Sequence, residues 1–390
     1  MTRFRQVLLW LIYLGILFEG GSFIFAKYFY DRAEAPTYSI PKWSGHSDYT
    51  RSYFTERSPW GVWHKNNVEV KHVSKCFDIT LRTNSYGARD RERPLKSNEF
   101  RVLVLGDSFV EGFGVDQDQR LTDLLEKEIG RTVLNFGSSG DVGPLQYRIL
   151  YEQFASTFDH DAIIVMILPD NDFTDNWLPY WKTMPEEEQR RYRPYYGTCG
   201  TDACPIYPSN PAQSPGAIYQ PVSFEDLSFI NKILLIWRHF SWSWSVYKSL
   251  SEIIAPPYSY PEDYSGYRDP TPSQVKAALS SIIRIRELAG NRPMLVALIP
   301  TPRDISALAA GNHSLLVPKA FEDAAHQYGF KFLDLAAPML EREPNPAKWF
   351  LSCNGHWSIL GNKLAAQVLA DRYNILIKGI KGAEKVPDAP

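Results

Sequence analysis

Four short segments of this 390-residue chain carry residue types that could together perform acyl transfer. A serine hydroxyl is a poor nucleophile unless a neighbouring base, commonly a histidine, takes its proton. Acyl transfer also builds negative charge on a carbonyl oxygen, where each fixed N–H donor lowers the barrier by about 3 kcal/mol. The candidate groups are the Ser108 hydroxyl, the His356 imidazole, and oxyanion-hole donors at Ser108, Gly140 and Asn171.

The segments that must position these groups alternate between two patterns. Short, continuously apolar runs are separated by helical patterns, which is typical of a parallel sheet covered on both faces. Ligands of such sheets bind beyond the carboxyl ends of the strands, where Ser108, Gly140 and Asn171 would lie, with His356 just before a C-terminal helix. The sequence therefore predicts an α/β fold with about five strands (100–106, 132–137, 162–168, 294–300, 330–336) and intervening helices at 120–129, 145–154, 272–288 and 317–328.

The four blocks GDS, NFGSSGD, LPDNDF and CNGHW, in this order, resemble the SGNH/GDSL hydrolase family. The segment TNSYGARDRE (83–92) is similar to the membrane-anchored bacterial members, and the likeness covers roughly residues 80 to 375. The resemblance implies a flavodoxin-like three-layer sandwich. It also implies that Ser108 is the nucleophile and His356 the base, and that Gly140, Asn171 and the Ser108 amide form the oxyanion hole.

Simpler interpretations remain open for each of these residues. Ser108 could merely cap a helix, and His356 could be a structural histidine. Asn171 could be an ordinary turn residue, and Gly137 competes with Gly140 for the role in the oxyanion hole. Asp107 is expected to be a supporting residue that hydrogen-bonds the turn amides around the nucleophile.

The chain departs from the family pattern beside its histidine. The family usually has an Asp two or three residues before the catalytic His, whereas Cys353 and Asn354 occupy those positions here. The Asn354 carbonyl oxygen could accept the imidazole proton, but it contributes no charge. Asn354 is therefore a third candidate catalytic residue in a weakened site. The alternative is that another acid, such as Asp334, orients His356.

The N-terminus is predicted to be a membrane anchor, residues 1–26. An apolar run of about 20 residues follows Arg3 and Arg5, which is enough to cross a hydrocarbon core of about 30 Å. A cleaved signal peptide is the competing interpretation, but small residues are missing where cleavage would be expected. The two arginines place the N-terminus inside and the body outside. Glu19 is costly at mid-membrane, so we expect it near an interface, protonated, or against a partner helix.

The rest of the chain divides into a β-rich lead-in (27–95), the hydrolase domain (96–378) and a loose tail (379–390). An aromatic, cap-like insertion (176–270) contains no sheet-like run. Its helical segment 224–250 is interrupted by charged residues, so we expect a cap helix on the domain or at the membrane surface rather than a second span.

The four cysteines suit an exported body. Cys199 and Cys204 bracket a short turn that a disulfide could close, which we favour over a zinc site. Cys76 and Cys353 could form a second disulfide.

The net charge of −2 argues against nucleic acid as a partner, and no metal or organic cofactor is implied. We therefore expect a serine esterase or acyl transferase on the periplasmic face of a bacterial inner membrane. Its substrate class would be an acylated small molecule or an envelope polysaccharide. The alternatives are a weakened binding or assembly protein in polysaccharide export, and a lipid-directed esterase.

Overall fold

The computed structural model describes residues 2–30, 35–36, 38, 53–74, 76–183, 192–199, 202–207, 224–254, 264–309 and 315–377. The chain divides into two compact units. The first unit contains residues 1–51 and 219–262, and the second contains residues 52–218 and 263–390. The predicted tail, 379–390, lies outside the described residues.

The second unit is built on a five-stranded parallel sheet with the order β11-β10-β7-β5-β6. All five apolar runs of the sequence form its strands. The central strands β7 and β10 are buried along their whole length and so are apolar throughout, whereas the edge strand β11 is only partly buried. The strands are β5 (Arg101–Gly106), β6 (Thr132–Gly137), β7 (Ala162–Ile167), β10 (Met294–Leu298) and β11 (Lys331–Asp334).

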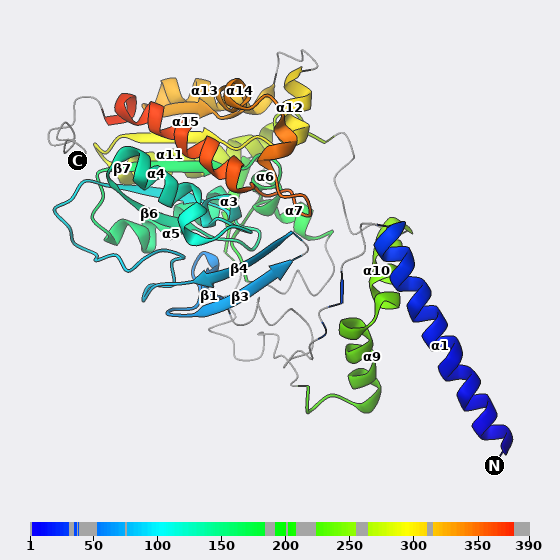
Figure 1. The fold of residues 1–390 in the computed structure, drawn as a ribbon. Helices are drawn as coiled ribbons and strands as arrows, with labels where there is room; N and C mark the ends of the chain where they lie inside the picture. The colour runs from blue at the N-terminus through cyan, green and yellow to red at the C-terminus, as the bar shows by residue number, and fades with distance from the viewer. Residues whose placement is uncertain are drawn as a thin grey trace. The chain divides into compact units, whose positions relative to one another are not determined.

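Helices cover both faces of this sheet (Figure 1). One face packs against α5 (Pro144–Gln153), α11 (Pro272–Ala289) and α13 (Leu316–Tyr328). The other packs against α4 (Leu121–Ile129), α12 (Pro302–Ala309), α14 (Ala336–Arg342) and α15 (Ile359–Ile377). The predicted α/β three-layer sandwich is confirmed.

The lead-in contributes two antiparallel hairpins to the second unit. They are β1 (Phe54–Ser58) with β2 (Gly61–His64), and β3 (Glu69–Ser74) with β4 (Phe77–Arg82). The GARDRE segment that follows supplies Arg89, which is fully buried. Its guanidinium donates to the carbonyls of Glu111, Gly112 and Val115. The lead-in therefore stabilises the segment 111–115, which follows the predicted nucleophile Ser108.

The insertion contains a hairpin that the sequence analysis missed. Strands β8 (Tyr195–Cys199) and β9 (Asp202–Ile206) pair antiparallel, so the expectation of no strand in 176–270 is wrong. Gly197 and Pro205 interrupt the strand pattern, and Cys199 is disulfide-bonded to Cys204 across the turn. A short covalently closed hairpin needs no long β-branched run, which is why the pattern was weak.

The first unit contains α1 (Thr2–Tyr28), α9 (Phe229–Phe240) and α10 (Trp242–Ile254). The predicted helical segment 224–250 is two helices rather than one. Ser241 between them is extended, and its hydroxyl accepts from the Trp244 N–H, so the chain starts a new helix there. Arg3–Tyr28 is long and apolar enough to cross a membrane, a property that a signal sequence would share.

Candidate active site

The strand order creates one position where ligands are expected to bind. The chain passes from β5 to β6 on one side and then crosses to β7 on the other, which is the switch point of a doubly wound sheet. Ser108 follows β5, Gly140 follows β6 and Asn171 follows β7. These strands are adjacent, about 4.8 Å apart, so the three segments end side by side at one sheet edge.

Ser108 and His356 are in direct contact despite their separation in the sequence. The Ser108 Oγ lies 2.6 Å from the His356 Nε2. On the other side of the ring, the His356 Nδ1 contacts the Asn354 Oδ1. That oxygen also accepts from the His356 backbone N–H at 3.0 Å, which requires the amide oxygen, not the nitrogen, to face the histidine. The Nδ1 therefore carries the proton, and the Nε2 lone pair faces the serine hydroxyl.

Two phenylalanines enclose the imidazole of His356. The Phe109 ring stacks on it with centroids 4.9 Å apart, and the Phe113 ring stacks at 4.3 Å. Burial lowers the pKa of His356 to about 4, although Glu111 attracts the imidazolium and so acts in the opposite direction. The histidine is thus neutral, and able to accept a proton, throughout the physiological pH range.

Asp107 is the N-cap of the short helix α3 (Ser108–Glu111). Its Oδ1 accepts from the Phe109 N–H at 2.9 Å, while its buried Oδ2 has no hydrogen-bond partner among the described residues. Burial raises the pKa of this carboxyl to about 7. The hydrogen bond from the Phe109 N–H to Asp107 holds the turn that contains Ser108.

The two glycines that compete for the oxyanion hole occupy different environments. A Cβ on Gly137 would lie 2.2 Å from the Glu111 backbone nitrogen, so glycine is needed there for α3 to pack closely on β6. Gly140 has φ +105°, a conformation that favours glycine, in the turn beyond the strand. Gly137 therefore has a packing role, and Gly140 lies in the turn that follows β6.

Side chains from three parts of the fold hold the Gly140 turn. The Ser138 Oγ donates to the Ser139 carbonyl at 3.2 Å. The buried Glu111 carboxylate accepts from the Ser139 N–H, and Arg193 donates to the Gly140 carbonyl at 3.1 Å. Arg193 is itself held over the Trp181 ring, 4.0 Å from its centroid. These contacts hold the turn in one conformation.

Glu111 belongs to a polar cluster beneath this turn. It also accepts from the Tyr53 hydroxyl at 2.9 Å, and the His64 Nε2 lies 3.6 Å away. Burial opposes the charged form, but attraction from His64 and the hydrogen bonds outweigh it and lower the pKa of Glu111 to about 2. A charged carboxylate thus connects the lead-in to the turn that carries Gly140.

Asn171 precedes α6 (Asp172–Asp175), in a turn closed by Asp172, whose Oδ2 accepts from the Leu168 N–H at 2.9 Å. The Asn171 Nδ2 donates to the Asp175 Oδ2 at 2.9 Å. An amide nitrogen carries two hydrogens, so this bond orients the side chain and leaves a second donor.

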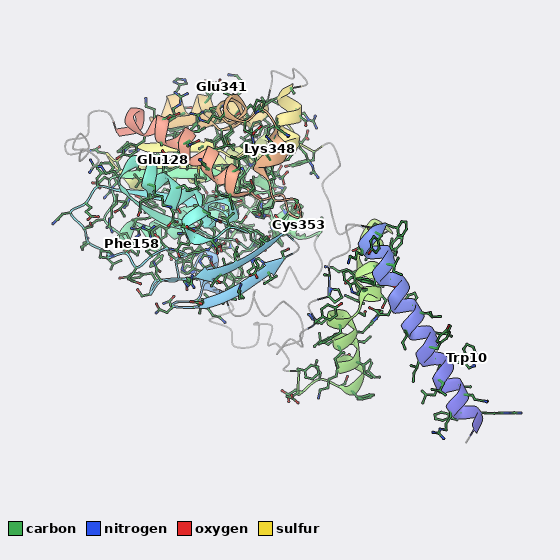
Figure 2. The ribbon with its side chains drawn as sticks, viewed as in Figure 1. Trp10, Glu128, Phe158, Glu341, Lys348 and Cys353 are labelled. Atoms are coloured by element: carbon green, nitrogen blue, oxygen red, sulfur yellow. A yellow bond between two sulfur atoms is a disulfide. The ribbon has the colours of Figure 1, made fainter. Side chains whose placement is uncertain are left out.

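The two disulfides pair the cysteines as the sequence suggested. Cys199 bonds Cys204 with Cα atoms 5.8 Å apart, and Cys76 bonds Cys353 at 5.7 Å. The second bond ties the β3–β4 turn to the loop that carries Asn354 (Figure 2, Cys353 labelled). Asp334, the alternative acid, accepts instead from the Tyr267 hydroxyl and the Ala336 N–H.

Four residues of this site were not predicted from the sequence: Phe109, Glu111, Phe113 and Arg193. Phe109, Glu111 and Phe113 follow Ser108 within five positions, so SFVEGF contained a local signal, whereas Arg193 lies in the insertion and had none. Within the described residues, no group of three or more His, Cys, Asp or Glu is placed to hold a metal ion.

Three solved structures are similar to this chain at 10–12% sequence identity. A lipolytic protein of the G-D-S-L family from Veillonella parvula is 12% identical with a TM-score of 0.38, over 70% of this chain and 98% of that one. The lipase/acylhydrolase from Enterococcus faecalis is 10% identical with a TM-score of 0.37, over 70% and 94%.

A carbohydrate esterase family 2 enzyme from Corynascus thermopiles is 12% identical with a TM-score of 0.37, over 73% of this chain and 69% of that one. No family model and no curated protein matches the chain.

Proposed function

We propose that this chain is a membrane-anchored serine ester hydrolase or acyl transferase of the SGNH type. The observation that carries the proposal is the contact chain Ser108–His356–Asn354, with the Ser108 Oγ 2.6 Å from the His356 Nε2. A serine hydroxyl against an oriented, neutral imidazole is the arrangement that activates an oxygen nucleophile.

In the proposed reaction the Ser108 Oγ attacks the acyl carbon while its proton passes to the His356 Nε2. The N–H groups of Ser108 and Gly140 and the Asn171 amide stabilise the oxyanion. His356 then protonates the departing alkoxide, which leaves an acyl-enzyme on Ser108. Water or an acceptor hydroxyl, deprotonated by His356, attacks this ester and restores the serine.

Asn354 provides only part of what an aspartate would provide. Its oxygen fixes the Nδ1–H tautomer, but it places no negative charge beside the imidazolium that forms in the transition state. We therefore expect a slower enzyme than one with a carboxylate at this position.

The proposed substrate is a small acyl ester, such as an acetyl group, on an envelope carbohydrate or polymer. We place the body on the outer face of a bacterial inner membrane, since Arg3 and Arg5 lie at the N-terminal end of α1, before its apolar run. This assignment rests on the anchoring and on the family resemblance. A lipid-directed esterase and a weakened binding protein are the alternatives that the experiment must separate.

The test is hydrolysis of p-nitrophenyl esters of increasing chain length by the full chain in detergent. Wild type should cleave the acetate best, and Ser108→Ala should lower kcat by at least about 10³-fold. Ser85→Ala, which removes an exposed hydroxyl outside the site, is the matched control and should retain activity. A preference for long chains would favour the lipid-directed enzyme. Equal rates for wild type and Ser108→Ala would exclude Ser108 as the nucleophile.

A further inference from the structure

The first unit presents an apolar surface that the proposed chemistry does not use. Residues on α9 recur at helical spacing along one stripe and are each 38% to 76% exposed: Phe229, Ile230, Ile233, Leu234, Ile236 and Phe240. Lys232, Arg238 and His239 lie outside the stripe. An apolar stripe with basic residues on the remaining face is typical of a helix that lies in a membrane interface.

The α9–α10 junction is attached to α1 through Glu19. The two carboxylate oxygens of Glu19 accept from the backbone N–H groups of Trp242 and Ser243, at the first turn of α10. The N-terminus of a helix has unpaired N–H groups and a positive dipole end, so a carboxylate is a favourable partner there. This contact explains why an acidic residue is tolerated in an otherwise apolar helix.

Helix α1 contacts α10 over an extended surface and not through Glu19 alone. Ser22 and Ala26, which lie three and seven residues after Glu19 on α1, are buried, whereas the consecutive residues Val7 to Leu11 are 47% to 65% exposed. The Phe23 ring packs edge-on against Trp242, with centroids 5.3 Å apart. The C-terminal part of α1 is thus the part that binds α10.

Internal contacts also fix α9 to α10. The Trp237 Nε1 donates to the Ser243 Oγ at 3.0 Å, and the Trp237 and Trp244 rings lie 5.0 Å apart. The Arg238 guanidinium lies 4.9 Å from the Trp244 ring centroid. The apolar stripe of α9 is therefore held by α10, which is held by α1.

The position of Glu19 sets the depth of this attachment. Glu19 precedes the end of α1 at Tyr28 by nine residues, about 14 Å of helix at 1.5 Å per residue. One half of a hydrocarbon core is about 15 Å thick. If α1 crosses the bilayer with Tyr28 at its surface, Glu19 and the start of α10 lie in the leaflet next to the C-terminal end of α1, toward the bilayer midplane.

We propose that α9 and α10 form a second membrane contact, with the apolar stripe of α9 embedded in the lipid of that leaflet. The proposal rests on the proposed anchoring by α1 and is independent of the ester chemistry. Lipid is the favoured occupant because α10 is bound to the one helix in the described residues that is long and apolar enough to cross a membrane.

The test places an environment-sensitive dye at single cysteines of the full chain in lipid nanodiscs. All cysteines described in the structure are disulfide-bonded, so the introduced thiol is the one that reacts. The stripe position is Ile233→Cys, the matched control on the opposite side of α9 is Asn231→Cys, and the anchor control is Leu11→Cys. Nitroxide-labelled lipids report contact with acyl chains, and iodide reports contact with water.

The dye at position 233 should be quenched by lipid nitroxides at least about threefold more than the dye at 231, since the proposed stripe contacts acyl chains and the opposite side of α9 does not. Glu19→Leu, which removes both acceptors, should reduce this quenching, whereas Glu19→Gln should retain most of it. Quenching at position 11 without quenching at 233 would overturn the proposal and leave the anchor intact. Shielding of position 233 from both quenchers would indicate a protein partner and would also overturn it.

Discussion

The residue beside His356 can do two things: fix the tautomer of the imidazole, and place a negative charge beside the imidazolium. Asn354→Asp separates these two effects, because it adds only the charge. The side-chain oxygen already accepts from the His356 Nδ1 and from its backbone N–H, so an aspartate can take the same place and add only a negative charge. In serine proteases, the reverse change lowers turnover about 10⁴-fold because the wrong tautomer is held. Here the tautomer is already correct, so the gain from restoring the acid should be smaller.

The negative charge of Asp at position 354 should change both the pKa of His356 and kcat. Two unit charges about 4 Å apart attract by about 4 kcal/mol at an effective dielectric constant of about 20. The desolvation of the new carboxylate offsets part of this, which leaves a rise of about 1–3 units in the pKa of His356. The same attraction should raise kcat at least about tenfold, equivalent to about 1.4 kcal/mol of the barrier.

The assay is the pH dependence of kcat/KM for p-nitrophenyl acetate. A general base works only when unprotonated, so activity falls as the pH drops through its pKa. Wild type should lose activity near pH 4, where burial places the pKa of His356, and Asn354→Asp should lose it at higher pH. The matched control, Asn345→Asp, adds the same charge at an exposed cap and should leave the profile unchanged. If folded Asn354→Asp loses kcat/KM at the same acidic pH as wild type, the argument that Asn354 orients His356 is refuted.

Three further predictions concern stability, the disulfide and topology. Glu111→Ala should lower the free energy of unfolding by about 3–5 kcal/mol, because it leaves buried donors such as the Ser139 N–H unpaired, whereas Glu111→Gln should cost less; calorimetry checks both. Cys353→Ser should lower the free energy of unfolding by about 2–5 kcal/mol and lower kcat, since the disulfide to Cys76 tethers the loop that carries Asn354. Denaturant unfolding and ester assays measure these two quantities, and full retention of both stability and kcat would argue against a tether. Alkaline phosphatase fused after Pro390 should be active if the body is exported, and an abundant but inactive fusion would contradict that topology.

The sheet could be predicted from the sequence because its central strands are buried on both faces. Strands β7 and β10 are continuous, fully buried apolar runs, a pattern that the edge strand β11 shows only in part. The β8–β9 hairpin was missed because its order comes from a disulfide and from Tyr196, which is buried in the core of the second unit. The break at Ser241 was missed because the partner of the new helix end, Glu19, is more than 200 residues away in the sequence.

The blocks after the strands indicated which residues could do chemistry, but not how they are oriented. The role suggested for Asn354 depends on which of its side-chain atoms faces the imidazole, a property of three-dimensional packing. The environment of His356 depends likewise on Phe109 and Phe113 stacking on its ring. Arg193 has no motif at all, because a buried cation over an aromatic ring leaves no periodic pattern.

The central claim is that Ser108 is an activated nucleophile, and covalent labelling tests it most directly. The full chain in detergent is treated with a fluorophosphonate probe, and the modified peptide is mapped by mass spectrometry. We predict phosphonylation at Ser108, slowed in His356→Ala because the base is lost, and absent in Ser108→Ala. If folded wild-type protein remains unlabelled at Ser108, the hydrolase proposal is contradicted, and a binding role becomes the better account of this site.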